Sequence, residues 1–189
     1  MLAPYLIIMG IGLTAIITLN TIFAQLSFWY CLIVSLLNFI CVFAMDGLFA
    51  FVIHKIPMKH FSPYKKIFLT SAREHTFYEK IKIRKWKDYI MELDSWGNFK
   101  KDKIGSTDPQ YMLRFLQENC CGEIIHYFCL ISGVANLIFL NYHFLNFSLP
   151  IIIVNLILNI PPIFIQRYNR PKLLHIYELK QPKATQLAD

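Results

Sequence analysis

The sequence predicts an all-α, polytopic membrane protein with four transmembrane helices and a cytoplasmic, interfacial amphipathic insertion between the second and the third. Three observations lead to this prediction. Of the 189 residues, 56% are hydrophobic and only 16% are charged, which is well below the usual quarter. Four apolar stretches have about the 20 residues that a membrane-spanning helix needs. All 19 Lys and Arg lie in two blocks, 55–114 and 167–183. This pattern indicates positive-inside topology rather than a nucleic-acid surface, so no nucleic acid is expected as a partner.

The four spans are expected within a single membrane domain of residues 1–189, at about 4–24, 28–53, 121–141 and 149–166. The short connector at 25–27 predicts an antiparallel hairpin of the first two. Four spans place both termini on one side, and the basic blocks make that side the cytoplasm. The predicted location is the cell (plasma) membrane. The first residues are apolar without a basic n-region, so a cleavable signal peptide is not expected.

The polar segment 55–120 separates the second and third spans. Residues 77–89 form a dense mixture of aromatic and basic residues, which predicts one amphipathic helix lying at the lipid headgroups. Its bases would attract anionic lipid or, in a sharper interpretation, hold a phosphorylated ligand. Residues 93–101 are expected to form a turn. A short helix is expected to start at Asp108-Pro109 and to run through Tyr111 to Glu118, with Asp108 as its N-cap and Pro109 in its first position. A cytoplasmic tail is expected over 167–189.

Polar side chains inside the last two spans mark a candidate site. Glu123 and His126 are three residues apart, so they share one helix face near the cytoplasmic side. In the antiparallel fourth span, Asn155, Asn159 and Gln166 share a face and return toward that depth. Asp46 and His54, in the second span, are expected at a similar level. Charged groups in a bilayer are costly and usually face a cavity or a partner. The alternative for the asparagines is simple hydrogen bonding between helices.

No metal and no cofactor are expected. Glu123-x-x-His126 is only half of a di-iron helix signature, and the sequence has neither a second copy nor two further suitable carboxylates. His-Glu-x-x-His, a Gly-x-Ser-x-Gly elbow and a phosphate loop are absent from the sequence. The five cysteines, among them Cys120 and Cys121, have no framework spacing and are expected to be free thiols.

Three stretches together resemble one family. They are Phe77–Lys87, the block from Glu118 through Glu123-x-x-His126, and Asn159-Ile160-Pro161 followed by Gln166-Arg167-Tyr168-Asn169-Arg170-Pro171. In order and spacing they are similar to the glycosyl-4,4′-diaponeurosporenoate acyltransferase family, named for the last step of staphyloxanthin synthesis. The resemblance covers about Phe77 to Leu174. This chain has Cys121-Gly122-Glu123 where the family tends to have Arg-Ala-Glu.

The resemblance implies an enzyme of the O-acyltransferase type (EC 2.3.1). It would move a fatty acyl group from a cytoplasmic acyl thioester, such as acyl-CoA, to a hydroxyl of a glycolipid-like acceptor. That acceptor would be a glycosyl carotenoid or another membrane lipid. On chemical grounds His126 is expected to be the general base, oriented by Glu123. Oxyanion stabilisation is expected from Asn169, Arg167 or Tyr168. The expected substrate-binding residues are Arg170, Gln166, Asn159, Arg84, Lys85, Trp86, Lys87 and Glu118, and Arg84, Lys85 and Lys87 would hold coenzyme A phosphates.

Two other functions fit the same residues. A non-catalytic small membrane protein would use the polar cluster to bind a lipid headgroup or a protein partner, and it would tolerate His126→Asn. A lipid hydrolase would use the same base and would release free fatty acid instead of an acylated acceptor. The oligomeric state is left open by the sequence.

Overall fold

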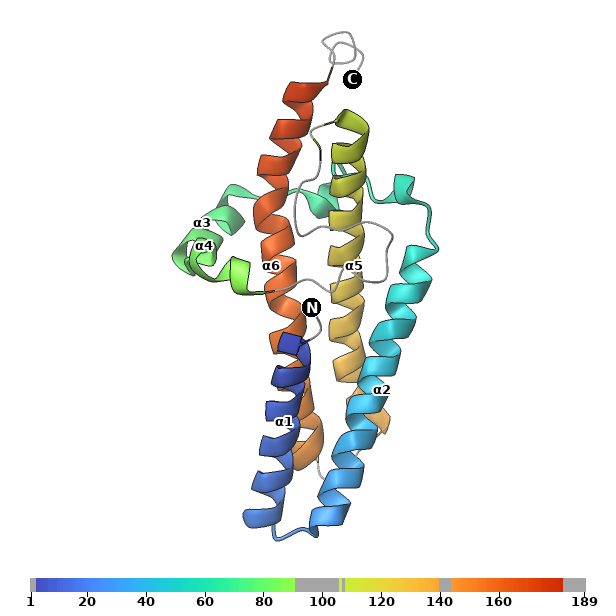
Figure 1. Cartoon of the computed structure of the whole chain (residues 1–189), viewed down its shortest axis with the longest axis vertical. Coiled ribbons are helices and arrows are strands. Elements are labelled where there is room, and N and C mark those ends of the chain that lie inside the picture. Colours follow the sequence, from blue (N-terminus) through green and yellow to red (C-terminus); the bar gives the residue numbers. More distant parts are fainter. Residues whose placement is uncertain (1–2, 91–105, 107, 140–143, 182–189) are drawn as a thin grey trace. The chain divides into compact units, whose positions relative to one another are not determined.

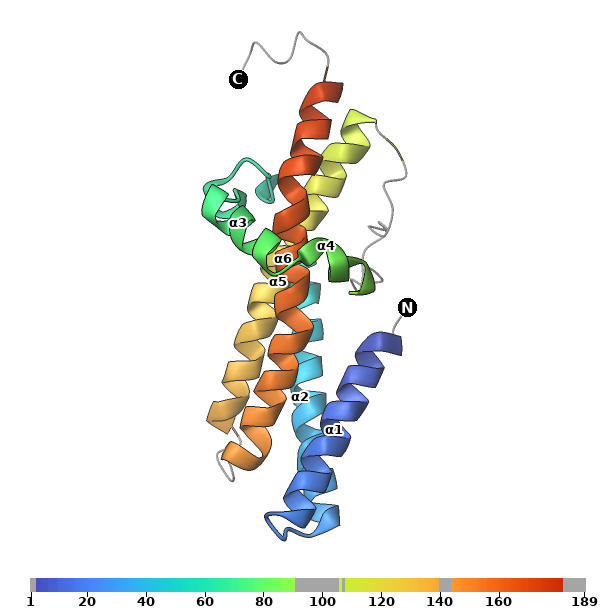
Figure 2. The same ribbon diagram turned by 90° about the vertical axis from the view of Figure 1, so that its left-hand side faces the viewer.

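The protein is all-α in its computed structural model, which describes residues 3–90, 106, 108–139 and 144–181 (Figures 1 and 2). The predicted turn at 93–101 lies outside these residues, as do the ends of the predicted third span and of the tail. The chain divides into two compact units. We call Met1–Phe51 with Ile125–Ile160 the apolar unit, and Val52–Ile124 with Pro161–Asp189 the charged unit.

The two units differ sharply in composition. All 19 Lys and Arg belong to the charged unit, and so do 11 of the 12 acidic residues, because only Asp46 lies in the apolar unit. Two described helical stretches, Phe28–His54 and Leu145–Lys180, are long and apolar enough to cross a membrane by length and composition. These two contain the predicted second and fourth spans. A membrane-spanning role for the other two predicted spans stays a prediction.

The first two helices of the apolar unit confirm the predicted hairpin. Helix α1 (Ala3–Ile22) and helix α2 (Phe28–His54) run antiparallel (Figure 1). The chain reverses through Gln25, whose backbone is left-handed with φ of 54°. The Asn20 amide donates to the Asn146 carbonyl at 2.8 Å, which ties the end of α1 to the segment before α6. The buried core of the unit consists of Ile16, Ile17, Cys31, Phe39, Val42, Phe147 and Ile151.

The predicted single helix over 77–89 is wrong. The insertion contains two one-turn 3-10 helices, Met58–His60 (η1) and Lys66–Phe68 (η2), and then helix α3 (Ala72–Lys80), helix α4 (Ile83–Trp86) and the turn Lys87–Tyr89 (η3). Between α3 and α4, Lys82 adopts a left-handed backbone with φ of 54°.

Burial of two apolar side chains explains this break. On one continuous helix, Tyr78 and Ile83 would point about 140° apart. With the left-handed turn between them, both are buried in one cluster with Ile165 of α6. The Trp86 indole also bridges the break, because its Nε1 donates to the Ile81 carbonyl at 3.0 Å. Packing within the protein therefore decides the local structure of this segment, and its predicted location at the lipid headgroups stays a prediction.

The last two helices are longer than predicted. Helix α5 (Pro109–Phe139) joins the predicted short helix and third span without interruption. Asp108 is its N-cap as predicted, since its Oδ2 accepts from the backbone N–H of Tyr111 at 3.1 Å. A π-helical turn, Phe144–Ser148 (η5), leads into helix α6 (Leu149–Lys180).

Helix α6 continues well past Gln166, where the predicted span ended, because its second half has packing partners in the charged unit. Tyr177 is buried with Met112 and Leu116 of α5. Three prolines lie inside α6, namely Pro161, Pro162 and Pro171. Proline has no backbone N–H, so Pro171 cannot donate a hydrogen bond to the carbonyl of Arg167 one turn earlier. The hydroxyl of Thr70 donates to this carbonyl instead, at 3.0 Å.

Candidate functional site

The centre of the charged unit is a buried carboxylate held by two arginines. Glu123 of α5 is fully buried. Its Oε1 accepts from Nη1 of Arg167 at 2.6 Å, and its Oε2 accepts from Nη2 of Arg170. Arg167 and Arg170 are three residues apart on α6, so one helix turn presents both guanidinium groups to α5. The structure therefore brings the polar end of the predicted fourth span to Glu123, as the sequence indicated.

Arg167 uses all five of its N–H donors within the protein. Besides Glu123, it donates in a bidentate pair to Glu74, from Nε to Oε1 and from Nη2 to Oε2. It also donates to the backbone carbonyls of Ile67 and Leu69, both at 3.0 Å. A guanidinium group has five N–H donors in a fixed fork. This geometry favours a structural role for Arg167, and its predicted role on an oxyanion stays a prediction.

Arg170 is almost completely buried and binds the same short segment of the insertion as Arg167 does. Its Nε donates to the side chain of Asn119 at 2.9 Å, and its Nη1 donates to the Phe68 carbonyl at 2.8 Å. The guanidinium carbon lies 5.3 Å from the centroid of the Phe68 ring. The two arginines together bind the backbone carbonyls of Ile67, Phe68 and Leu69. Because every residue has a backbone carbonyl, the sequence of this segment does not reveal the contact.

The residues between the arginines face the α3–α4 segment. The Tyr168 hydroxyl donates to Glu79 at 2.8 Å and accepts from Nε of Arg84 at 2.6 Å. The hydrogen bond from Tyr168 and the charge of Arg84 keep the pKa of the Glu79 carboxyl below its usual value. Nζ of Lys87 donates to Oδ1 of Asn169 at 3.4 Å. Each residue from Arg167 to Arg170 thus has its own partner in the charged unit.

The other predicted binding residues of the charged unit are dispersed. Lys85 is exposed, and its ammonium has no partner among the described residues. Trp86 is half-buried in the cluster with Ile83 and Ile165 described above. Gln166 is buried, and its Oε1 has no hydrogen-bond partner among the described residues. Glu118 is buried and forms an ion pair with Arg114 at 2.6 Å.

The apolar unit contains the predicted base. Nδ1 of His126 lies 2.9 Å from Oδ1 of Asn159. The Asn159 amide group donates to the Asn155 backbone carbonyl at 3.0 Å, which fixes which end of the carboxamide faces the imidazole. Because a carboxamide oxygen only accepts, Nδ1 must carry the proton, and Nε2 is then the basic nitrogen. The contact that orients His126 was predicted for Glu123, and in the structure Asn159 makes such a contact. Both carboxylate oxygens of Glu123 accept hydrogen bonds from arginines. An orienting role for Glu123 stays a prediction.

A chain of hydrogen bonds extends from this pair to the one acidic residue of the apolar unit. The Asn155 amide donates to the Cys129 carbonyl at 3.1 Å. The Ser132 hydroxyl is shared between that carbonyl, at 2.8 Å, and the carboxylate of Asp46 on α2. Gly133 allows the close packing of α5 and α6 here, because a Cβ atom at this position would lie 2.7 Å from Oδ1 of Asn155.

Sequence reasoning missed Glu74, although a signal was present. Ser71-Ala72-Arg73-Glu74 is a capping-box pattern. The structure has this box at the start of α3, with Ser71 Oγ accepting from the Glu74 N–H at 3.2 Å. Hydrogen bonds from Arg167 keep the pKa of the Glu74 carboxyl below its usual value. The same carboxylate accepts from the Tyr78 hydroxyl at 2.5 Å, and burial together with this anion raises the pKa of Tyr78.

We expect Glu74→Gln to lower the thermal stability of the detergent-solubilised protein in a pH-dependent way. A carboxylate with a lowered folded-state pKa stabilises fully above its unfolded pKa of 4.5, and this contribution disappears as the pH falls through the lower, folded-state value. At pH 7 the loss is expected to be about 1.5–3 kcal/mol, the usual range for hydrogen bonds to a charged group. Melting curves at pH 7 and at lower pH should show the gap closing. Asp88→Asn, at an 81% exposed side chain, is the matched control with little effect. An equal melting temperature for Glu74→Gln and wild type at pH 7 would contradict this prediction.

Taken together, these features define an all-α protein with two helices of membrane-spanning length and a polar cluster built around one turn of α6. The chain belongs to the glycosyl-4,4′-diaponeurosporenoate acyltransferase family, whose sequence model matches residues 57–179, well over half of its length. This is a family of acyltransferases (EC 2.3.1) in carotenoid (staphyloxanthin) biosynthesis. The match confirms the predicted family and enzyme class and is wider than the predicted Phe77 to Leu174. It includes every residue of the Arg167–Arg170 cluster and leaves out α1 and α2. Searches of curated proteins and of solved structures gave no significant match.

Proposed function

We propose that this chain is an integral membrane acyltransferase that transfers a fatty acyl group from a cytoplasmic acyl thioester to a hydroxyl of a glycolipid-like acceptor. The family match over residues 57–179 is the observation that carries the proposal. The family is named for glycosyl-4,4′-diaponeurosporenoate, so a glycosyl carotenoid is the first acceptor to test. The acyl thioester donor is proposed because the basic residues are themselves proposed to lie on the cytoplasmic side.

We propose that the protein lies in the plasma membrane. Its proposed topology has four spans, with both termini in the cytoplasm. Two helices of spanning length support it, and so does the charge distribution. With every Lys and Arg in the charged unit, the positive-inside rule assigns that unit to the cytoplasmic side. Acyl thioesters are polar at one end and apolar at the other, so a membrane protein with a basic cytoplasmic face suits both parts of the donor.

In the proposed mechanism, Nε2 of His126 takes the proton from the acceptor hydroxyl. The oxygen attacks the thioester carbonyl, and collapse of the tetrahedral intermediate breaks the carbon–sulfur bond. His126 then returns the proton to the departing thiolate, which balances the transfer. The hydrogen bond between Asn159 and Nδ1 at 2.9 Å supports this role, because it holds the imidazole in the tautomer that a base requires.

The charged unit is proposed to bind the donor, and an oxyanion role for one of its polar side chains stays a prediction. Asn169 is the best oxyanion candidate of the three predicted residues, because only its Oδ1 has a partner among the described residues and its amide N–H groups can donate. The Tyr168 hydroxyl already donates to Glu79. Arg84 and Lys87 lie beside this turn of α6, and with the exposed Lys85 they offer bases for the phosphates of coenzyme A.

Lipid mass spectrometry of cells with the gene deleted and then restored tests the proposal. One lipid should lose the mass of a fatty acyl group on deletion and regain it on restoration, and this lipid identifies the acceptor. Purified protein with labelled acyl-CoA should transfer label to that acceptor. Release of label only as free fatty acid would indicate a hydrolase. An unchanged lipid profile with no turnover of acyl-CoA would favour a binding protein.

A further inference from the structure

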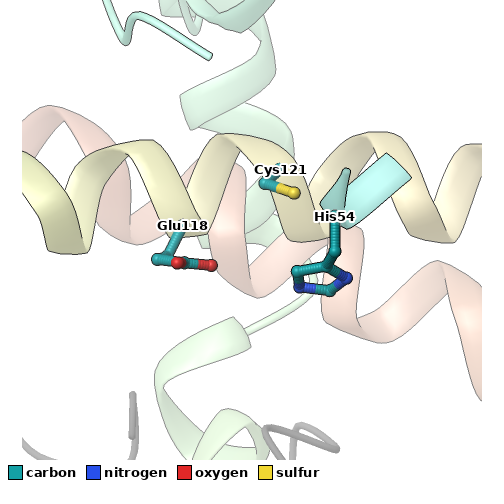
Figure 3. A group of neighbouring side chains, drawn as sticks. All are labelled: His54, Glu118 and Cys121. Carbon is teal, nitrogen blue, oxygen red and sulfur yellow. The ribbon is translucent and has the colours of Figure 1, made fainter. Parts of the chain in front are cut away.

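A second cluster of chemically active side chains lies in the charged unit, apart from the residues used in the proposed mechanism. His54 is the last residue of α2, and Glu118 and Cys121 are one turn apart on α5. Each residue offers one ligand atom, and these three atoms lie within 4.8 Å of one another. They are an imidazole nitrogen, a carboxylate oxygen and the thiol sulfur. Figure 3 shows Glu118 and Cys121 on the side of α5 where the His54 ring lies.

The burial of these side chains restricts what the cluster can do. Glu118 is 3% exposed and Cys121 is fully buried, while His54 is half-buried. The described ion pair of Glu118 uses Oε1 and a half-exposed arginine, Arg114. Removing a carboxylate from water costs desolvation free energy, and one cation that is itself partly solvated offsets only part of that cost. A cation between the three donors would provide it and would also lie near the carboxyl-terminal end of α2, where the helix dipole favours positive charge.

The types of donor indicate which cation. Calcium and magnesium prefer oxygen ligands, whereas imidazole and thiolate are typical ligands of zinc and of similar transition-metal ions. Zinc–ligand bonds of about 2.0–2.3 Å at tetrahedral angles place neighbouring donor atoms about 3.5 Å apart. The three donors of the charged unit would therefore need to approach one another by up to about 1.3 Å, which rotation about the side-chain bonds of Glu118 and His54 can provide.

We propose that His54, Glu118 and Cys121 bind one divalent transition-metal ion of the zinc class, with water as the fourth ligand. Binding converts the Cys121 thiol to a thiolate and releases its proton to solvent. The ion joins the end of α2 to the middle of α5, so its primary role is to stabilise the charged unit. The proposal does not depend on the proposed acyl transfer, and it would reverse the expectation of no metal that the sequence analysis gave.

Cobalt substitution tests the site with a spectroscopic signal that only the thiolate can give. Purified, detergent-solubilised protein is stripped with a chelator and titrated with Co²⁺. We expect a near-ultraviolet thiolate-to-cobalt charge-transfer band that saturates at one ion per chain and is displaced by Zn²⁺. Cys121→Ser should abolish the band. Cys120→Ser, which removes the adjacent and equally buried thiol, should keep it.

Two further measurements keep the test decisive if the Cys121 variant is poorly folded. His54→Asn should keep the band and weaken Co²⁺ binding at least tenfold, because losing even an outer-shell partner of a metal ligand typically costs about 10- to 100-fold in affinity. Added Zn²⁺ should raise the melting temperature of wild type and of Cys120→Ser, because an ion that binds only the folded state stabilises it. Three results would each overturn the site: no charge-transfer band in wild type, a band lost equally in both cysteine variants, or no change in melting temperature with Zn²⁺.

Discussion

Replacing Glu123 by glutamine is expected to unfold or strongly destabilise the charged unit. The carboxylate is fully buried and bonds two arginines, of which Arg170 is almost completely buried as well. Removing one partner of a buried ionic cluster leaves uncompensated charge and typically costs about 3–5 kcal/mol. Many single domains have a total stability of only about 5–15 kcal/mol. We therefore expect little folded protein from Glu123→Gln, and lost activity as a consequence of lost structure.

Glu79→Gln is the matched control for this prediction. Glu79 also accepts from an arginine and is close to the same turn of α6, but its side chain is 40% exposed. Exposed ion pairs contribute about 0–1 kcal/mol, so this variant should be produced at the level of wild type. Fluorescence-detected size-exclusion chromatography and melting temperatures in one detergent compare the two. A Glu123→Gln protein that melts within about 1 °C of wild type would show that the arginines do not need this carboxylate.

Replacing His126 by alanine is expected to lower kcat for acyl transfer by about 10²- to 10⁴-fold, the usual contribution of a general base. The melting temperature should change little, because the imidazole is only partly buried. His126→Asn should be as inactive as the alanine variant, because asparagine can donate and accept hydrogen bonds but has no titratable nitrogen. Turnover of labelled acyl-CoA by the purified protein with the acceptor lipid measures both effects.

Two further variants separate this role from a structural one. His175→Ala removes an exposed histidine elsewhere on α6 and should leave kcat unchanged. Asn159→Ala removes the group that holds Nδ1, so it should lower kcat less than His126→Ala and should shift the pH profile of the reaction. If His126→Asn instead kept normal transfer, His126 would not be the base, and a role in binding a lipid headgroup would explain its position better.

Much of the fold could be predicted because apolar length and charge position are read directly from the sequence. The apolar runs without Lys or Arg predicted the bounds of α1 and α2 to within two residues of those in the structure. The pair Asp108-Pro109 predicted where α5 starts. The meeting of Glu123 with the polar end of the fourth apolar run followed from antiparallel packing alone. That argument needs only the position of each residue along its helix axis, which follows from the number of residues and the constant rise per residue.

The remaining differences come from contacts that local sequence does not contain. The left-handed turn at Lys82 exists because Tyr78 and Ile83 are both buried against α6, a long-range packing demand that overrides the local helical pattern. The guanidinium groups of Arg167 and Arg170 bind backbone carbonyls at 67–69, and any residue can supply a carbonyl. The group formed by His54, Glu118 and Cys121 depends on where α2 ends beside α5, which periodicity does not specify.

Pro171, in the last third of α6, has an evolutionary consequence. Pro171 leaves the Arg167 carbonyl open to a donor from elsewhere in the chain, and Thr70 supplies it. An alanine at 171 would restore an N–H that can compete for the same carbonyl. Loss of the Thr70 hydroxyl should therefore be harmful in the present background and nearly neutral after Pro171 has been replaced. The order in which the two substitutions occur would decide whether a descendant passes through an unstable intermediate, so the two positions are expected to change together and in a fixed order.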